Sequence, residues 1–308
     1  MISTHLMGGL GNQLFQIFTT IAYGINEKIK IVFPYAKVLN TGINRPTYWD
    51  SFLSRLKPFT AGEINKNPSN EEIYSWRLIR ETGFSYNEIP RIPESINILL
   101  YGYWQSYKYF DSVKDTIFRW IKIDELRKTI YNEYSTYFTS LHVEDDKMHE
   151  TDEIQIVSMH FRLGDYKSLP DCHPILPKEY YYKSLKYIKE SNNNNITTKV
   201  LYFCEAEDNS TVLEIIRYLQ IIFEDTIFIK VDDTIPDWKQ MIIMSLCDHN
   251  IIANSSFSWW GAYLNNDISK IVCYPDIWFG PKILNGMNHS EFVKDMYPSD
   301  WIRVSINQ

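Results

Sequence analysis

The sequence predicts an α/β protein with two Rossmann-like domains. Three observations support this prediction. Short apolar runs alternate with helical periods through the second half of the chain, the first half opens with a strand, a glycine-rich turn and a helix, and 308 residues suffice for two domains of roughly 150 residues. Strands that alternate with helices of this size are typical of a parallel sheet covered by helices on both faces.

The first half begins with a strand expected at Ile2–Met7, followed by a turn rich in glycine. The helix after this turn carries one apolar stripe, formed by Leu14, Ile17, Phe18, Ile21 and Ile25. Another strand is expected at Lys30–Phe33. The stretch Arg45–Ile98 is rich in Trp and Tyr and interrupted by prolines, so we expect an α/β unit with long excursions there.

The second half alternates more regularly. Strands are expected at Ile154–His160, Leu201–Cys204, Thr226–Val231, Asn250–Ala253 and Lys270–Tyr274. Between them, helical stripes are formed by Tyr181, Leu185 and Ile188, by Val212, Ile215, Ile216 and Leu219, and by Trp238, Met241, Ile242, Ser245 and Leu246. Residues 154–275 are therefore expected to form a Rossmann-like domain. The polar segment Glu144–Glu153 is the best linker candidate, which places the domains at residues 1–150 and 151–308, and the last helix could pack back on the first.

Composition excludes several classes of protein. The chain has 31 basic and 38 acidic residues and a net charge of −7, which argues against a nucleic-acid or anionic-membrane binder. Its four cysteines form no C-x-x-C pair, so reduced core thiols are favoured over a zinc site or disulfides. No apolar run reaches about 18 residues and no signal peptide is evident, so we expect a soluble, cytoplasmic protein without a transmembrane segment.

The loop His160–Tyr166 directly follows an expected strand, and ligands of open α/β sheets bind beyond the carboxyl ends of strands. Arg162 would present a planar, permanently charged fork that suits phosphate oxygens. Gly164 allows a sharp turn, and Asp165 could orient Arg162 or His160. The alternative is a loop arginine paired with Asp165 for structure alone.

A second candidate loop, Asn254–Leu264, begins directly after another expected strand. Ser255 and Ser256 are natural N-caps, and the free N–H groups of a helix start, including that of Phe257, can hold phosphate. The helix dipole contributes only about 0.3–1 kcal/mol at exposed sites, so a full cation is needed beside it. Alternatively, the serines only cap the helix, and the two tryptophans of this segment are expected in the core.

Two further motifs are less specific. Gly8–Gln13 is close to a dinucleotide fingerprint, but Leu14 replaces its last glycine and no acidic residue stands about 20 residues later, which disfavours a nicotinamide enzyme. Asn12 offers an amide at this helix start. The acidic run Glu205–Asp208 could bind a divalent ion, face the N–H donors of a nucleobase or simply be a solvated loop.

Four blocks in order resemble the family-11 glycosyltransferases, the inverting α-1,2-fucosyltransferases; they are residues 8–13, 101–106, 160–166 and 254–264. The resemblance covers roughly residues 1–275. It implies a GT-B-like fold of two facing Rossmann-type domains with a donor and acceptor cleft between them. It also implies a GDP-fucose donor in the second domain, a glycan acceptor held mainly by the first, and neither a metal nor another cofactor.

The resemblance also implies roles for single residues. Arg162 would bind the donor β-phosphate, Asn12 would face the reacting centre, and the remaining donor-side residues would be His160, Gly164, Ser255, Ser256 and Phe257. The chain departs from the family at Leu163, where a second basic residue is common. It departs again at residues 203–206, which read Phe-Cys-Glu-Ala where the family usually has Phe-Ser-Asp-Asp. By the resemblance, this segment contains the residue that contacts guanine, which here would be Glu205.

The expected reaction moves a sugar through an oxocarbenium-like state while negative charge builds on the departing diphosphate. A base must also take the acceptor proton, and the candidates are Asp165, His5 and Asp111. An aromatic ring and an amide suit a sugar, so the expected acceptor residues are Tyr103, Trp104 and Gln105, although core packing explains Trp104 equally well. The alternatives are another GDP-sugar transferase of different linkage and a non-catalytic glycan-binding protein.

Overall fold

The structure is a computed structural model that describes residues 1–40, 43–62, 66–139, 154–191 and 196–306. The contacts divide the chain into two compact units. Unit 1 comprises Met1–Glu125 and Ser290–Pro298, and unit 2 comprises Leu126–His289 and Ser299–Gln308. The chain therefore passes into unit 1 and back again near its end. The linker expected at Glu144–Glu153, and the expected boundary between residues 150 and 151, lie outside the described residues.

Unit 1 contains a three-stranded parallel sheet in the order β1-β5-β4, formed by β1 (Ile2–Thr4), β5 (Ile98–Tyr101) and β4 (Arg77–Arg80). The helix α1 (Leu10–Asn26) follows β1 and buries most of the predicted stripe, including Leu14 and Phe18. The predicted first strand is thus confirmed, but it ends three residues earlier than expected.

The strand expected at Lys30–Phe33 was wrong as a complete strand. Ile31 and Phe33 make only isolated bridges, to Ile2 and to Thr60. Pro34 follows directly and lacks the N–H that a longer ladder needs, which explains why the pairing stops here.

The rest of unit 1 is made of short elements, as the Pro-interrupted sequence predicts. The pair β2 (Val38–Leu39) and β3 (Arg45–Pro46) is antiparallel. The short helices are η1 (Ser54–Phe59), α2 (Asn70–Tyr74), η3 (Tyr107–Tyr109), η4 (Asp111–Val113) and α3 (Lys114–Ile121). The boundary between the units falls inside two helices, α4 (Ile123–Glu133) and α10 (His289–Phe292), so each helix has residues in both units.

Unit 2 is built on a six-stranded parallel sheet in the order β11-β10-β9-β6-β7-β8. The strands are β6 (Ile154–His160), β7 (Thr197–Phe203), β8 (Thr226–Lys230), β9 (His249–Ile251), β10 (Val272–Pro275) and β11 (Ile302–Val304). Counted from β6, this order is 3-2-1-4-5-6, that of the Rossmann fold. The five expected strands are confirmed to within a few residues, and β11 was not expected.

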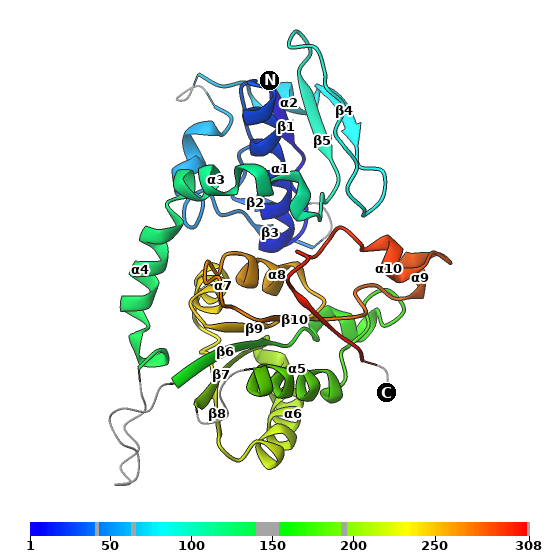
Figure 1. The fold of residues 1–308 in the computed structure, drawn as a ribbon. Helices are drawn as coiled ribbons and strands as arrows, with labels where there is room; N and C mark the ends of the chain where they lie inside the picture. The colour runs from blue at the N-terminus through cyan, green and yellow to red at the C-terminus, as the bar shows by residue number, and fades with distance from the viewer. Residues whose placement is uncertain (41–42, 63–65, 140–153, 192–195, 307–308) are drawn as a thin grey trace. The chain divides into compact units, whose positions relative to one another are not determined.

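Helices cover both faces of this sheet (Figure 1), with α5 and α6 on one face and α7 and α8 on the other. The helical elements are η5 (Ser135–Tyr137), η6 (Gly164–Ser168), α5 (Lys178–Ser191), η7 (Ala206–Asp208), α6 (Asn209–Ile222), α7 (Asp237–Ser245), α8 (Ser256–Tyr263) and α9 (Pro281–Leu284). The predicted stripes of α5 and α6 contribute Leu185, Ile188, Val212 and Leu219 to one buried core. The predicted α/β class with two Rossmann-like units is confirmed.

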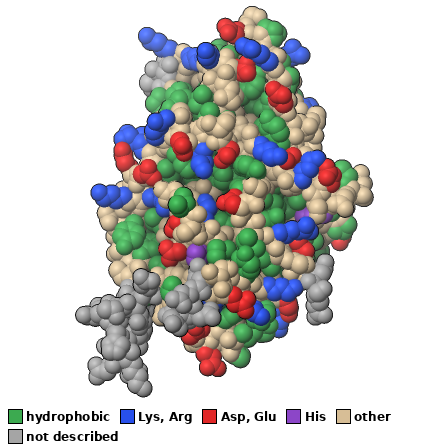
Figure 2. All heavy atoms as spheres, viewed as in Figure 1, with side chains coloured by type: hydrophobic (Ala, Val, Ile, Leu, Met, Phe, Trp, Pro, Cys, Tyr) green, Lys and Arg blue, Asp and Glu red, His purple; other side chains and the backbone are tan. Residues whose placement is uncertain are grey.

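The four cysteines are free thiols, three of them buried, as their spacing indicates. Within the described ranges, no helix is both long enough and apolar enough to span a membrane. On the face drawn in Figure 2, basic and acidic side chains are interspersed, in keeping with the mixed charges of the sequence.

Candidate functional site

The carboxyl edge of the sheet in unit 2 brings two of the predicted loops together. Strands β6 and β9 are neighbours, with Met159 opposite Ile251. After β6 the chain proceeds to one half of the sheet, and after β9 to the other half, so the point between them is the topological switch point. Ligands of such sheets bind beyond the strand ends at this point. The loop that carries Arg162 and the start of α8 are the two segments that leave these ends.

Arg162 lies among acidic and aromatic side chains. Its Nη1 donates to Glu205, and its Nη2 donates to Asp165 Oδ1 at 2.5 Å. Its guanidinium carbon lies 5.2 Å from the centre of the Tyr166 ring. Burial by itself would lower the pKa of this guanidinium, but the carboxylates of Glu205 and Asp165 raise it, and the net shift is upward. Arg162 is therefore a fixed cation with two carboxylate partners.

The backbone of this loop is held by Asp208, a residue that sequence reasoning placed only in an acidic run. The buried Asp208 accepts a hydrogen bond from Gly164 N at 2.7 Å and forms an ion pair with Lys167 at 2.5 Å. Gly164 has a φ of +33°, and a Cβ there would lie 2.6 Å from Glu205 Oε2. The positive φ favours glycine at this turn, and a larger residue would also displace the Glu205 carboxylate.

His160 ends β6 beneath the Arg162 loop. The centre of its ring lies 5.5 Å from that of Phe257, so His160 links the end of β6 to the start of α8. Burial, with the nearby positive charges of Arg162 and Lys230, lowers the pKa of His160 to about 3. Its Nδ1 is buried and has no hydrogen-bond partner among the described residues. A neutral imidazole therefore lies under the loop.

The start of α8 has the expected cap. Ser255 Oγ accepts a hydrogen bond from Phe257 N at 3.3 Å. Tyr166 Oη donates to Asn254 O at 3.0 Å and so ties the two loops together. Ser256 is half-buried beside this start. The helix buries Trp259 and Trp260 fully, which agrees with the core interpretation of both tryptophans.

The remaining predicted residues lie in unit 1, at the carboxyl edge of its sheet. Gln105 Nε2 donates to Asn12 Oδ1 at 2.8 Å, so these two amides form one pair. Gly8 has a φ of +75°, and a Cβ there would lie 2.5 Å from Asn12 Nδ2. The turn before α1 therefore depends on glycine to bring its backbone against the Asn12 amide.

Trp104 is 3% exposed and packs edge-on against Tyr109, with ring centres 5.4 Å apart. Its ring belongs to the core, as the alternative interpretation states. Gln105 is also buried, whereas Tyr103 is half-buried. Of the three residues expected to hold the acceptor, Tyr103 is thus the one with a ring at the surface of unit 1.

Sequence reasoning missed Glu81, which directly follows β4. Its carboxylate accepts hydrogen bonds from Tyr103 N at 2.6 Å and Trp104 N at 2.8 Å. Burial raises the pKa of Glu81 to about 7, against the smaller lowering effect of these two amides. An acidic residue after a strand would have been the signal, but the segment Arg77–Arg80 is mostly exposed and has no apolar face to reveal it as a strand.

Of the three base candidates, His5 lies after β1 with its ring 5.3 Å from Tyr101, and burial lowers its pKa. Asp165 is the partner of Arg162, and Asp111 is exposed in η4. In the part of the chain that the structure describes, no three His, Cys, Asp or Glu side chains gather as a metal site requires.

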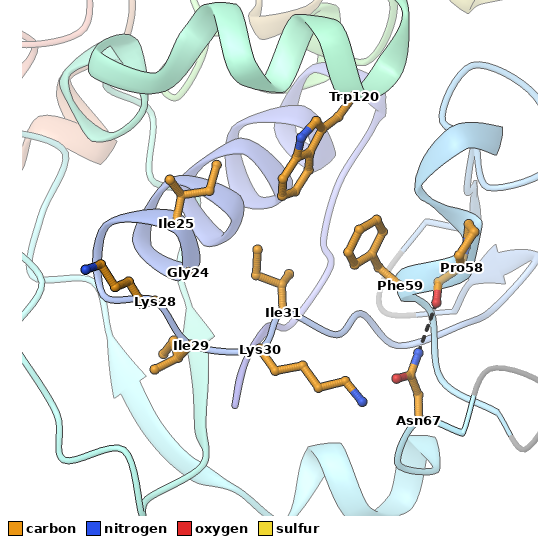
Figure 3. Close-up of a pocket in the computed structure, with 10 residues that line it drawn as sticks. All are labelled: Gly24, Ile25, Lys28, Ile29, Lys30, Ile31, Pro58, Phe59, Asn67 and Trp120. Carbon is orange, nitrogen blue, oxygen red and sulfur yellow. Dashed lines mark hydrogen bonds between the residues drawn. The ribbon is translucent and has the colours of Figure 1, made fainter.

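Unit 1 also has an open hollow of about 510 Å³ (Figure 3), at the opposite end of α1 from Asn12. Phe59 and Trp120 stack on one side of it, with ring centres 5.5 Å apart. Lys30 also lines it, and the Lys30 carbonyl accepts a hydrogen bond from Ile2 N at the start of β1. The hollow therefore lies at the amino edge of this sheet and contains none of the predicted site residues.

Comparison with known proteins gives the family of this α/β protein. The model of glycosyl transferase family 11 matches residues 1–303, and the chain belongs to this family. It is a glycosyltransferase.

Two relatives come from Escherichia coli. An alpha-1,2-colitosyltransferase is 28% identical over 99% of both chains. The O-antigen biosynthesis glycosyltransferase WbnK is 29% identical over 64% of this chain and 59% of that protein. Among solved structures, the glycosyl transferase family 9 protein from Veillonella parvula DSM 2008 is similar over 99% of this chain and 86% of that chain, with 13% identity and a TM-score of 0.48.

Proposed function

We propose that the protein transfers L-fucose from GDP-fucose to a galactose hydroxyl of a glycan, forming an α-1,2 linkage with inversion. One observation supports this proposal above all. A half-buried cation, Arg162, and a capped helix start, at Ser255, follow neighbouring strands on the two sides of the switch point in unit 2. This is where a Rossmann-type sheet holds a nucleotide diphosphate.

The chemistry of the leaving group explains the residue types. As the bond from the sugar to the diphosphate breaks, negative charge gathers on the β-phosphate oxygens. Arg162 offers a fixed charge, and the N–H groups at the start of α8, including that of Phe257, offer aligned dipoles. Ser255 and Ser256 add hydroxyl donors at the same point. These groups can perform the neutralisation that a metal ion performs in other transferases.

The carboxylates around Arg162 bear on donor binding. A guanidinium has five N–H donors, and Glu205 and Asp165 each accept from one of its terminal nitrogens. Phosphate oxygens would use the remaining donors or compete with these carboxylates. Glu205 would therefore adjust the affinity of the Arg162 site for the diphosphate. To contact guanine, Glu205 would have to give up its hydrogen bond with Arg162.

A second donor is supported by the alpha-1,2-colitosyltransferase, which matches the whole chain. Colitose is a fucose that lacks its 3-hydroxyl, so GDP-colitose would present the same diphosphate and linkage carbon. A pocket that donates or accepts a hydrogen bond at the 3-hydroxyl would favour fucose, because an unpaired buried group costs free energy. The donor sugar therefore distinguishes the two candidates.

The test offers the protein GDP-fucose, GDP-colitose, GDP-mannose and UDP-galactose with a panel of β-galactosides, and identifies products by mass spectrometry. We expect transfer from GDP-fucose, and we expect EDTA to leave the rate unchanged. Preference for GDP-colitose would select the second donor. Binding of glycan without binding of GDP in calorimetry would overturn the enzyme proposal in favour of a glycan-binding protein.

A further inference from the structure

We propose that Glu81 is the general base that takes the proton from the acceptor hydroxyl. This inference rests on the proposed transfer reaction, because a sugar hydroxyl becomes a competent nucleophile only as its proton leaves. It replaces the three base candidates that the sequence suggests with a residue that only the structure reveals.

The first argument is position. Glu81 follows β4, residues 102–105 follow β5, and His5 follows β1, so all of them lie at the carboxyl edge of one parallel sheet. Asn12 reaches the same place through its hydrogen bond with Gln105. Glu81 is therefore directly connected to the segment that carries the expected acceptor residues.

The second argument is the way the carboxylate is held. Trp104 has a φ of +56°, rare for a bulky residue, and this conformation lets two successive backbone N–H groups point at one carboxylate. A Cβ on Gly102 would lie 2.3 Å from Glu81 Cβ, so glycine is required next to it. The strained backbone of Trp104 therefore holds the Glu81 carboxylate in one position.

The third argument is protonation capacity. Each carboxylate oxygen of Glu81 accepts one backbone hydrogen bond and keeps a further lone pair for a proton. Among the described residues, no Lys, Arg or His side chain forms an ion pair with it. Burial without a cation raises the pKa of Glu81 to about 7, where a base is effective at neutral pH.

The groups that face Glu81 do not compete in this pH range. The phenols of Tyr103 and Tyr109 interact with it, and burial raises the pKa of both. The guanidinium carbon of Arg80 lies 4.6 Å from the centre of the Tyr101 ring. His5 also contacts the ring of Tyr101, with ring centres 5.3 Å apart, and burial lowers its pKa, so it must be tested separately.

The step balances as follows. The acceptor hydroxyl oxygen forms a bond to the anomeric carbon of the sugar as its proton passes to a carboxylate oxygen of Glu81. The bond from that carbon to the diphosphate oxygen breaks, and its electron pair leaves with GDP. The products are the glycoside and GDP, and the proton on Glu81 is later released to water.

The experiment measures transfer against pH for the wild-type protein and for Glu81→Gln, His5→Gln and Glu88→Gln, the last an exposed control on the same stretch. We expect wild-type kcat/KM to fall below about pH 7. Glu81→Gln should lose about 10²–10⁴-fold in kcat and lose this acidic limb. Its affinity for GDP should stay at the wild-type level, because Glu81 lies in unit 1 and GDP is expected in unit 2.

A role confined to holding the Tyr103–Gln105 segment would raise the acceptor KM and leave the acidic limb in place, which would overturn the proposal. So would a wild-type profile that is flat between pH 5.5 and 8.5, or an acidic limb that disappears in His5→Gln instead. Should Glu81→Gln fold poorly, formate added to Glu81→Ala must restore transfer if Glu81 is the base. If the wild-type protein transfers no sugar at all, the proposed function fails instead.

Discussion

At the scale of single residues, the donor site depends on one permanent charge. Arg162 is held by Asp165 and Glu205 and stacks on Tyr166, so its position is set before any ligand arrives. Such preorganisation lets a charged group stabilise the leaving diphosphate without paying for reorganisation during the reaction.

We therefore expect Arg162→Ala to lower kcat by about 10²–10³, a typical loss for one preorganised charge-stabilising group. Arg162→Lys should recover only part of it, because an ammonium cannot reproduce the planar fork. Steady-state transfer rates test this, with Arg217→Ala on the exposed face of α6 as the control. A wild-type kcat in Arg162→Ala would contradict the role given to the guanidinium.

At the scale of elements, the start of α8 has both a structural and a proposed binding role. Ser255 satisfies the N–H of Phe257, and the helix that follows buries two tryptophans in the core. An equivalent cap occurs in unit 1, where Ser69 Oγ accepts from Glu72 N at 3.2 Å at the start of α2. Removing each cap in turn therefore distinguishes a loss of stability, which both variants should show, from a loss of ligand binding, which only the α8 variant should show.

Ser255→Ala should lower the free energy of unfolding by about 0.5–2 kcal/mol and weaken GDP binding. Ser69→Ala should have a stability cost in the same range and leave GDP binding unchanged. Urea unfolding and calorimetry with GDP measure the two effects. Equal GDP affinity in both variants would show that the α8 cap is structural alone.

At the scale of the whole molecule, the end of the chain contributes to both units. Asp295 is buried in unit 1, where its carboxylate accepts from Lys108 and from Tyr86 N, and its carbonyl accepts from Ser106 Oγ. The chain then returns to unit 2 and forms β11, where Ile302 pairs with Cys273. Folding of unit 1 therefore requires residues that are distant in sequence.

Asp295→Ala should destabilise the protein by about 1–3 kcal/mol, because Tyr86 N and the Lys108 ammonium lose the buried carboxylate that they bind. Asp300→Ala, at an exposed position shortly after it, should change stability by no more than about 0.5 kcal/mol. The free energies come from urea titrations of the full chain. Equal stabilities of the two variants would mean that the crossing segment contributes nothing to unit 1.

Much of unit 2 could be predicted from local pattern. The strands from β6 to β10 are apolar runs of the right length, and Arg162 and Ser255 lie in the loops that follow β6 and β9. The edge strand β11 was missed because it is only three residues long, and the exposed strand β4 because it carries no apolar alternation. Glu81 was missed with β4, since nothing local marks a half-buried carboxyl group whose partners are the backbone amides of a distant loop.

By itself, the sequence determined the fold class, the helix α1, the helices α5 to α8, the strands β6 to β10 and the loops of the donor side, because periodicity and capping are local properties of the chain. Only the tertiary structure decided the strand order 3-2-1-4-5-6 in unit 2, which makes neighbours of β6 and β9. It also decided that Glu81 meets the amides of Tyr103 and Trp104. Both depend on pairing between distant segments, and the free energy of such pairing comes from packing that no short stretch of sequence contains.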